Sequence, residues 1–285
     1  MTRTRRLNIG FFLTFFAVAL ASMILFGVRK ASVDARFAAL SDAARAACSA
    51  PADPDQGPRL YLIGDSSLSR WPAGAFAPGW ETINCSLGRE TAAQLARRFT
   101  NFDFLRPRDA ALISSGLYDL VAASFFEDAR AGEAVGQTTG ILLDLARAAS
   151  ARDARVLLAT LIPPSERDTT RRAIWRDSLR DLIADANARL RGMTLGGRIE
   201  LVDFAAALNT DDRTTANNYR IDALHVNAIG NKKLATVVEH ALSTIENCPV
   251  RLMLLNMVRT DTAGGDGLGY GYGYGYGYGY ETPAA

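Results

Sequence analysis

The hydrophobic and polar positions divide the chain into an apolar beginning, an alternating middle and a repetitive end. An uncharged, mostly apolar stretch runs from Leu7 to Val28. As an α-helix it would span about 33 Å, and the hydrocarbon core of a bilayer is about 30 Å thick. A core helix of a globular domain would not be apolar on every face over such a length. The pattern therefore predicts a membrane-spanning helix over residues 7–28.

Two fates are open for this segment. The Ala-Leu-Ala sequence at residues 19–21 resembles a signal-peptide cleavage site, whereas the apolar residues 23–26 prolong the segment and favour an uncleaved signal anchor. Basic residues lie on both sides, with Arg3, Arg5 and Arg6 before it and Arg29, Lys30 and Arg36 after it. Together with the terminal amine, this slight asymmetry predicts a cytoplasmic N-terminus and a periplasmic or extracellular domain.

Residues 31–49 are predicted to form a short amphipathic helix that serves as a spacer, with apolar positions at Val33, Phe37, Leu40 and Ala44. A cluster of helix-breaking residues ends it, namely Pro51, Pro54, Gly57 and Pro58. The predicted organisation is a basic end and anchor over 1–30, a juxtamembrane helix and linker over 31–56, a globular domain over 57–250 and a low-complexity tail over 251–285.

The middle of the chain alternates between short apolar runs and amphipathic segments. Apolar runs predict strands at residues 60–63, 110–113, 156–159 and 199–202, with a weaker one at 82–84. Helical patterns fall at 91–99, 134–149, 170–191 and 228–245, the last with Asn227 placed as its cap. Continuously apolar strands indicate a sheet that is buried on both faces. The alternation therefore predicts a parallel α/β sandwich with active groups at the strands' carboxyl ends.

Composition narrows the function classes. A hydrophobic content of 48% excludes wholesale disorder. The chain has a net charge of +2, but residues 1–30 contain five basic residues and no acidic one. The rest of the chain therefore has 27 basic and 30 acidic residues, which is a net charge of −3. Such a slightly acidic domain is a poor partner for nucleic acid. Three Cys and two His leave little room for a metal site, so no metal or cofactor is expected.

Two short motifs carry candidate chemistry. The first predicted strand runs into Gly64-Asp65-Ser66, which by itself is an ordinary turn. Asp222 and His225 stand just before the last predicted helix. A serine nucleophile needs a base, and the imidazole needs a carboxylate that fixes its tautomer. The other histidine, His240, falls inside the last predicted helix, so His225 is the candidate base.

These motifs resemble the blocks of the SGNH (GDSL) hydrolase family, in the same order, over about residues 59–246. The resemblance implies that Ser66 is the nucleophile, His225 the general base and Asp222 its orienting partner. Residues 83–91 are similar to the second block, and residues 116–119, Gly-Leu-Tyr-Asp, are similar to the third, which normally reads Gly-x-Asn-Asp. The family's fold is a three-layer α/β/α sandwich with a five-stranded parallel sheet of the flavodoxin-like type.

Two departures affect the oxyanion hole that the resemblance implies. The family uses N–H groups of the nucleophile, here Ser66, and of a second-block Gly, which falls on Arg89 with Gly88 one place earlier. The third donor is an Asn side chain, and Tyr118 stands at its position. Loss of one oxyanion donor costs about 2.7–4 kcal/mol of transition-state stabilisation. A slow enzyme and a protein that has lost catalysis are both compatible with this change.

Two function classes therefore remain. The first is a membrane-anchored serine esterase that cleaves, or transfers, a short acyl group such as acetyl from a carbohydrate or lipid ester outside the cytoplasmic membrane. The second is a catalytically weakened or inactive binding or scaffold protein of the same fold in polysaccharide processing. Trp71 and Trp80 follow Ser66 and either line a cleft or pack the loop.

The remaining features have simpler interpretations. Cys48 and Cys248 flank the domain, and one hypothesis is that they pair in an oxidising compartment and tie its two ends together, with Cys85 as a buried packing residue. Residues 269–280 are six Gly-Tyr pairs, for which a solvated tail is favoured over an adhesive one. The apolar residues 250–258 either dock on the domain or lie against a membrane.

Overall fold

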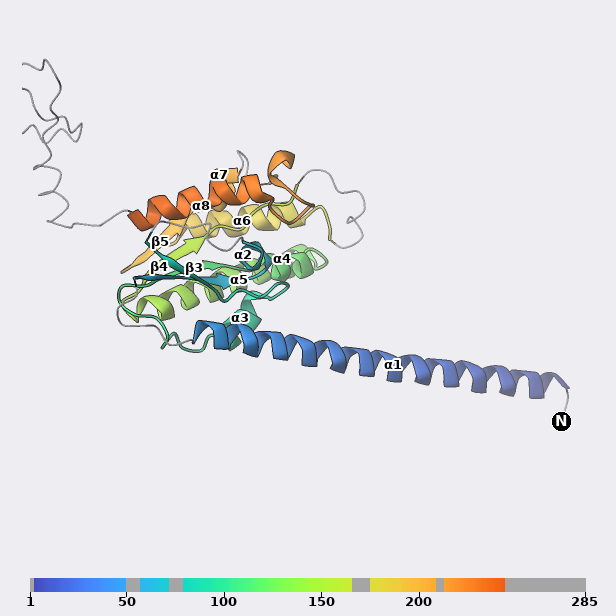
Figure 1. The fold of residues 1–285 in the computed structure, drawn as a ribbon. Helices are drawn as coiled ribbons and strands as arrows, with labels where there is room; N and C mark the ends of the chain where they lie inside the picture. Colours follow the sequence, from blue (N-terminus) through green and yellow to red (C-terminus); the bar gives the residue numbers. More distant parts are fainter. Residues whose placement is uncertain (1–2, 50–56, 72–78, 166–174, 209–212, 244–285) are drawn as a thin grey trace, which may run out of the picture. The chain divides into compact units, whose positions relative to one another are not determined.

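The computed structural model describes residues 3–49, 57–71, 79–165, 175–208 and 213–243. The chain divides into one unit of Met1–Glu239 and a second of His240–Ala285, and of the second only residues 240–243 are described. In the first unit, five parallel strands form one sheet in the order β2-β1-β3-β4-β5 (Figure 1). Their bounds are β1 Arg59–Gly64, β2 Glu81–Asn84, β3 Ala110–Ser114, β4 Arg155–Ala159 and β5 Ile199–Val202.

Helices cover both faces of this sheet (Figure 1). One layer consists of α3 (Ala92–Arg98), α4 (Leu117–Ala123), α5 (Asp128–Ser150) and α6 (Leu179–Gly192), which contact one another. The other layer contains α8 (Ala228–Ser243), and the short helices are α2 (Ser66–Ser69), α7 (Phe204–Leu208) and the 3-10 turn Asn217–Tyr219. The predicted three-layer sandwich is confirmed, and the strand order is the flavodoxin-like one.

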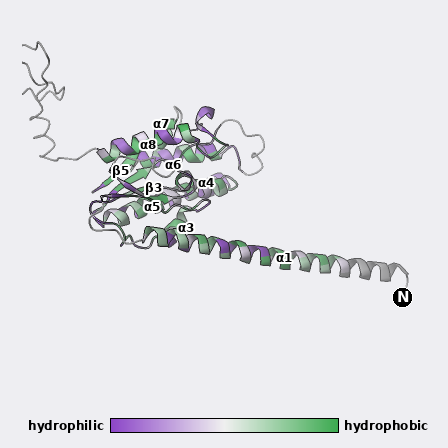
Figure 2. Ribbon diagram, viewed as in Figure 1, coloured by the Kyte–Doolittle hydropathy of each residue, from purple (hydrophilic) through white to green (hydrophobic). Residues whose placement is uncertain are grey.

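Alternate residues of the strands supply the two halves of the core. Ile63 and Ile113 pair in register between β1 and β3 and belong to a buried cluster with side chains from α3, α5 and α6. Leu62 and Leu112 pair one position earlier and are equally buried outside that cluster. Because both sets are buried, the central parts of β1, β3 and β4 are hydrophobic, whereas α6 and α8 carry both kinds of residue (Figure 2).

Helix boundaries differ from the prediction in two places. Helix α5 begins at Asp128, six residues before the predicted start at Ala134. Helix α6 begins at Leu179, and residues 175–178, which the pattern placed in the helix, form turns instead. The apolar periodicity continues through Trp175 because its side chain is buried in the core cluster without being helical.

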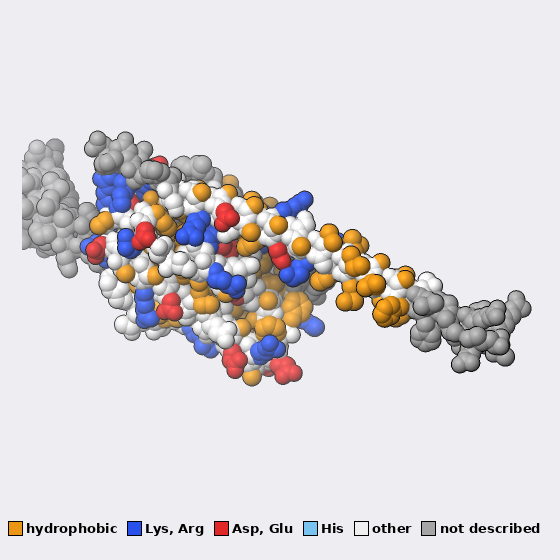
Figure 3. Space-filling view, turned by 90° about the horizontal axis from the view of Figure 1, so that it is seen from below, with side chains coloured by type: hydrophobic (Ala, Val, Ile, Leu, Met, Phe, Trp, Pro, Cys, Tyr) orange, Lys and Arg blue, Asp and Glu red, His pale blue; other side chains and the backbone are white. Residues whose placement is uncertain are grey.

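The N-terminal region forms one continuous helix, α1 (Arg3–Cys48), where the sequence predicted a spanning helix and a separate spacer helix. Arg29 and Lys30 do not interrupt it, since basic residues favour helices and Lys30 pairs with Asp34 one turn later at 2.7 Å. Hydrophobic side chains gather on the earlier part of its described surface, and charged ones appear towards its C-terminal end (Figure 3). By length and composition it is the one described helix that could cross a membrane.

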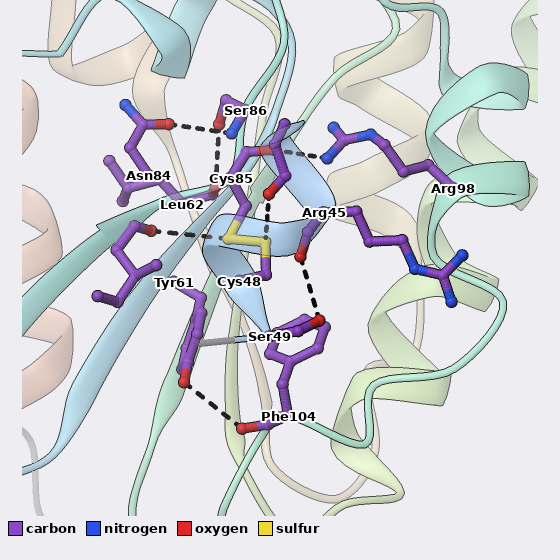
Figure 4. The surroundings of a disulfide bond; sticks show 12 residues. Arg45, Cys48, Ser49, Tyr61, Leu62, Asn84, Cys85, Ser86, Arg98 and Phe104 are labelled. Atoms are coloured by element: carbon purple, nitrogen blue, oxygen red, sulfur yellow. Dashed lines mark hydrogen bonds between the residues drawn. A yellow bond between two sulfur atoms is a disulfide. The ribbon is translucent and has the colours of Figure 1, made fainter. Parts of the chain in front are cut away.

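The disulfide joins Cys48 to Cys85, so the predicted pairing of Cys48 with Cys248 is wrong (Figure 4). Cys48 ends α1, and Cys85 directly follows β2, which contacts α1. Both cysteines are fully buried, and their Cα atoms are 5.7 Å apart. Cys248 lies outside the described residues, as do the segment 250–258 and the Gly-Tyr repeat.

Candidate active site

The turn after β1 presents Ser66 at the carboxyl edge of the sheet. Asp65 caps α2 by accepting a hydrogen bond from the backbone N–H of Ser67 at 2.8 Å. Ser66 is therefore the first residue of α2, and it is only 4% exposed. At Gly64 a β-carbon would lie 1.9 Å from the carbonyl oxygen of Ser114, so only glycine lets β1 approach β3 this closely.

The carboxyl group of Asp65 is buried directly before Ser66. Burial raises its pKa to about 6, although hydrogen bonds from the N–H and the hydroxyl of Ser67 act in the opposite direction. The Asp65 side chain thus caps the N-terminus of α2 and stabilises the turn that contains Ser66.

His225 and Asp222 form a close pair in the loop before α8. The Nδ1 atom of His225 lies 2.8 Å from Oδ2 and 2.9 Å from Oδ1 of Asp222. Partial burial would raise the pKa of Asp222, but hydrogen bonds from the His225 ring and from the backbone N–H groups of Leu224 and His225 lower it to about 2. An ionised Asp222 fixes the ring orientation and leaves Nε2 available as a proton acceptor.

The fold holds this loop above the sheet edge. The N–H of Ser165, in the segment after β4, donates to the carbonyl of Ala223 at 2.9 Å. Within the loop, the N–H of Ile221 donates to the carbonyl of His225 at 2.9 Å, and the Arg220 guanidinium donates to the carbonyl of Leu224 at 2.6 Å. These bonds fix the backbone that carries Asp222 and His225.

Among the buried side-chain atoms that have no hydrogen-bond partner in the described residues are the Oγ of Ser66 and the Nε2 of His225, so these two atoms do not bond to each other. Oδ2 of Asp65 and Oγ of Ser115, which follow β1 and β3 at the same edge, are also without a partner there. Catalytic hydrogen bonds are often long in structures without substrate and tighten on binding. An unpaired hydroxyl and an unpaired imidazole nitrogen are the two groups that a nucleophile and its base require.

The second block lies beside Ser66. A β-carbon at Gly88 would be 3.9 Å from the β-carbon of Ser66, so the backbone of Gly88 borders the candidate nucleophile. The amide of Asn84 donates to the carbonyl of Leu68 in α2 at 3.0 Å and ties this loop to the Ser66 helix. Arg89 has a φ of 69°, a left-handed conformation that glycine adopts most easily.

In the third block, Tyr118 stands where the resemblance led us to expect an asparagine side chain as an oxyanion donor. This residue is the second of α4, it is half-buried, and its side chain makes no hydrogen bond with the described residues. Asp119 has a structural role, because its Oδ2 accepts from the backbone N–H of Ala92 at 2.8 Å at the start of α3. Gly116 before them has a φ of 110°, which explains the glycine of this block.

Sequence reasoning missed the ion pair of Glu90 and Arg98, which lies under the second block. Both side chains are buried, the guanidinium bonds both carboxylate oxygens, and it also donates to the carbonyl of Cys85 at 2.7 Å. Nothing in the residue spacing signalled this pair, although the Thr91–Gln94 capping box beside it was readable as a helix start. Arg98 of this pair holds the backbone carbonyl of Cys85, and the disulfide holds its side chain.

Other candidate residues are placed as follows. Trp71 is buried, and its ring lies 5.8 Å from the Phe204 ring in a tilted arrangement, so it packs the loop instead of lining a cleft, whereas Trp80 is half-buried. His240 lies in α8, as its sequence position indicated. Among the described residues, no group of three or more His, Cys, Asp and Glu is arranged to hold a metal ion.

Solved bacterial structures share this fold. A Streptococcus pneumonia protein, provisionally described as a platelet activating factor, has 17% sequence identity and a TM-score of 0.59 over 79% of this chain and 99% of its own. A Bacteroides fragilis NCTC 9343 protein, provisionally described as an acylhydrolase, has 18% identity and a TM-score of 0.53 over 70% of this chain and 93% of its own. These similarities confirm the expected α/β fold with a five-stranded parallel sheet between helices. No family model and no curated protein matches the sequence.

Proposed function

We propose that the protein is a serine ester hydrolase of the SGNH type. The observation that carries this proposal is the pairing of His225 with an ionised Asp222 while the Nε2 atom of His225 and the Oγ atom of Ser66 are both buried and unpartnered. The similarity in fold to a protein described as an acylhydrolase supports the same class.

The proposed reaction has two halves. The Oγ of Ser66 attacks the ester carbonyl carbon and its proton passes to Nε2 of His225, which then protonates the departing alcohol as the carbon–oxygen ester bond breaks. Water next attacks the acyl-Ser66, returns the proton through His225 and releases the acid. When a sugar hydroxyl takes the place of water, the same residues transfer the acyl group instead.

We assign the oxyanion-stabilising role to the backbone N–H groups of Ser66 and of Gly88 or Arg89. Gly88 borders Ser66 closely enough for this role. A backbone donor persists whatever the side chain, which is why arginine at position 89 does not by itself remove the hole.

For the substrate and location we propose a short acyl ester, such as an acetylated carbohydrate or a lipid ester, outside the cytoplasmic membrane. The apolar residues 7–28 at the start of α1 support a membrane tether, and a disulfide between Cys48 and Cys85 fits an oxidising compartment.

A fluorophosphonate probe on the full-length protein in nonionic detergent tests this function. Labelling is expected in the wild type and absent in Ser66→Ala. The matched control is Ser67→Ala, which removes the neighbouring hydroxyl in the same turn and should still be labelled. Labelling that persists in Ser66→Ala would disprove the assignment of the nucleophile.

A second candidate is a binding or scaffold protein that retains the cleft without catalysis. The specific observation in its favour is Tyr118, whose side chain replaces the third-block amide and bonds to no described residue. The absence of labelling and of ester hydrolysis in the wild type, together with retained binding of an acetylated glycan, would favour this alternative.

A further inference from the structure

A groove of about 550 Å³ lies between the later part of α1 on one side and α3 with the loop before it on the other. Val33, Phe37 and Ala38 of α1 give it an apolar wall. The rest of its lining is polar and mostly charged, and consists of Ser41, Gln94, Asp34, Asp42, Arg45, Arg89, Arg97 and Arg98. The groove thus combines an apolar wall with several guanidinium groups.

Two of the charged residues in the groove are already neutralised. Asp34 pairs with Lys30 at 2.7 Å, and Arg98 pairs with the buried Glu90.

The other three arginines, Arg45, Arg89 and Arg97, are exposed and form no ion pair with a described residue. Asp42 is the one carboxylate of the lining that has no such partner among the described residues. The groove therefore has an excess of positive charge, which attracts an anion.

Arg89 connects this groove with the candidate active site. It directly follows Gly88, whose backbone borders Ser66, and its own side chain lines the groove. Its φ of 69° is a conformation in which a side chain is strained and glycine is not. The chain thus retains a guanidinium at a position where its backbone favours glycine, and such strain is commonly found at functional sites.

We propose that the groove binds an anionic group of the ester substrate while the acyl carbon lies at Ser66, so that the natural substrate is an anionic ester. This inference rests on the proposed function and specifies its substrate class. In this arrangement Arg45 of α1 and Arg97 of α3 bind the anionic group from opposite walls of the groove. Arg89 binds it at the end nearest Ser66, and the apolar wall contacts the carbon skeleton next to the anionic group.

Two matched esters test this proposal on the full-length protein in nonionic detergent at low salt. They are 4-acetoxybenzenesulfonate, which is anionic, and 4-acetoxybenzenesulfonamide, which is neutral and of nearly the same shape. The measured quantity is the ratio of kcat/KM for the anionic ester to that for the neutral one. A change in the folded fraction of a variant affects both esters equally and cancels in this ratio. The difference in intrinsic reactivity between the two esters is the same for every variant, so a change of the ratio between variants reports recognition of the charge.

Arg45→Gln and Arg97→Gln are each expected to lower this ratio about 1.5- to fivefold, as exposed charge pairs allow. Asp42→Asn should raise it, because it removes the opposing charge, and 0.5 M salt should diminish all of these differences. The matched control is Arg36→Gln, which removes the same charge from α1 but does not line the groove.

The outcomes separate the two proposals. A ratio that does not change in Arg45→Gln and Arg97→Gln, or that falls equally in Arg36→Gln, would overturn the anionic-substrate inference while leaving the esterase standing. Failure of the wild type to hydrolyse either ester in a Ser66-dependent manner would overturn the proposed function and this inference together.

Discussion

At residue 89 the backbone has a φ of 69°, and the only other described non-glycine residue with a positive φ is Asp153, at 58°. The left-handed conformation of a non-glycine residue costs about 1 kcal/mol. Arg89→Gly removes this strain, although the more flexible unfolded chain offsets part of the gain. We expect a rise of up to about 1 kcal/mol in the free energy of unfolding, measured by urea denaturation, together with weaker discrimination in favour of the anionic ester.

Asp153→Gly is the matched control for this prediction. Asp153 lies in the turn between α5 and β4, away from the groove lining. It should also gain stability and leave the ratio of the two esters unchanged. If Arg89→Gly retained full discrimination, Arg89 would have no part in recognising the anion.

The raised pKa of Asp65, about 6 against an ordinary value of 3.8, makes stability depend on pH. Between these values the folded state binds the proton and the unfolded state releases it, so the free energy of unfolding falls as pH rises from about 4 to 6. The shift corresponds to a loss of about 3 kcal/mol. Asp65→Asn should remove most of this slope, as measured by urea denaturation at several pH values.

The control for Asp65 is Asp144→Asn, which neutralises a carboxylate that is 79% exposed in the side chain. It should leave the slope as in the wild type. An Asp65→Asn variant with the wild-type slope would show that another group titrates in this range.

Tyr118 provides the sharpest test of the oxyanion site under the proposed function. Its hydroxyl bonds to no described residue, so Tyr118→Phe should change kcat little. Tyr118→Asn supplies a side-chain amide at the family's donor position and is expected to raise kcat, by up to about 10²–10³-fold if the amide reaches the oxyanion. A marked loss of kcat in Tyr118→Phe would instead identify the hydroxyl as the donor.

At the scale of elements, the disulfide fastens the end of α1 to the segment after β2. Cross-linking residues that are 37 positions apart stabilises a fold by about 2–4 kcal/mol. Cys85→Ser should therefore lower the melting temperature by several degrees, and reduction of the wild type should have a similar effect. Cys248→Ser is the control and should melt like the wild type. A Cys48–Cys248 peptide in a non-reduced digest would contradict the pairing.

The strands could be predicted almost residue by residue, whereas other features could not. The runs at residues 60–63 and 110–113 became β1 and β3 with one added residue or two, because strands that are buried on both faces are apolar without interruption. The start of α6 was misplaced because Trp175 continues the apolar pattern outside the helix. The predicted disulfide was wrong because three cysteines permit three different pairs, and their spacing in the sequence does not show which pair forms.

At the scale of the whole molecule, the candidate site joins segments that are far apart in the sequence. The pairing of Asp222 with His225 is present in the structure, and the roles of Ser66, Asp222 and His225 stay a prediction that rests on parallel strands bringing their carboxyl ends to one edge. The groove could not be predicted in this way. It exists because α1 continues past the apolar segment and lies beside α3, and the two together line the groove. The order of hydrophobic and polar residues predicts neither the full length of α1 nor its position beside α3.

The continuity of α1 also bears on the membrane anchor. From Val28, the last residue of the apolar stretch, to Cys48 the helix advances by about 30 Å without a break. If residues 7–28 form an uncleaved anchor, the full-length protein should resist extraction with alkaline carbonate and retain its unprocessed mass. Alkaline phosphatase fused after Ser49 should be active, because that end of α1 would lie outside. A mature N-terminus just after residue 21 would instead establish a cleaved signal, and the domain would then be released in soluble form with Val33–Arg45 and the groove intact.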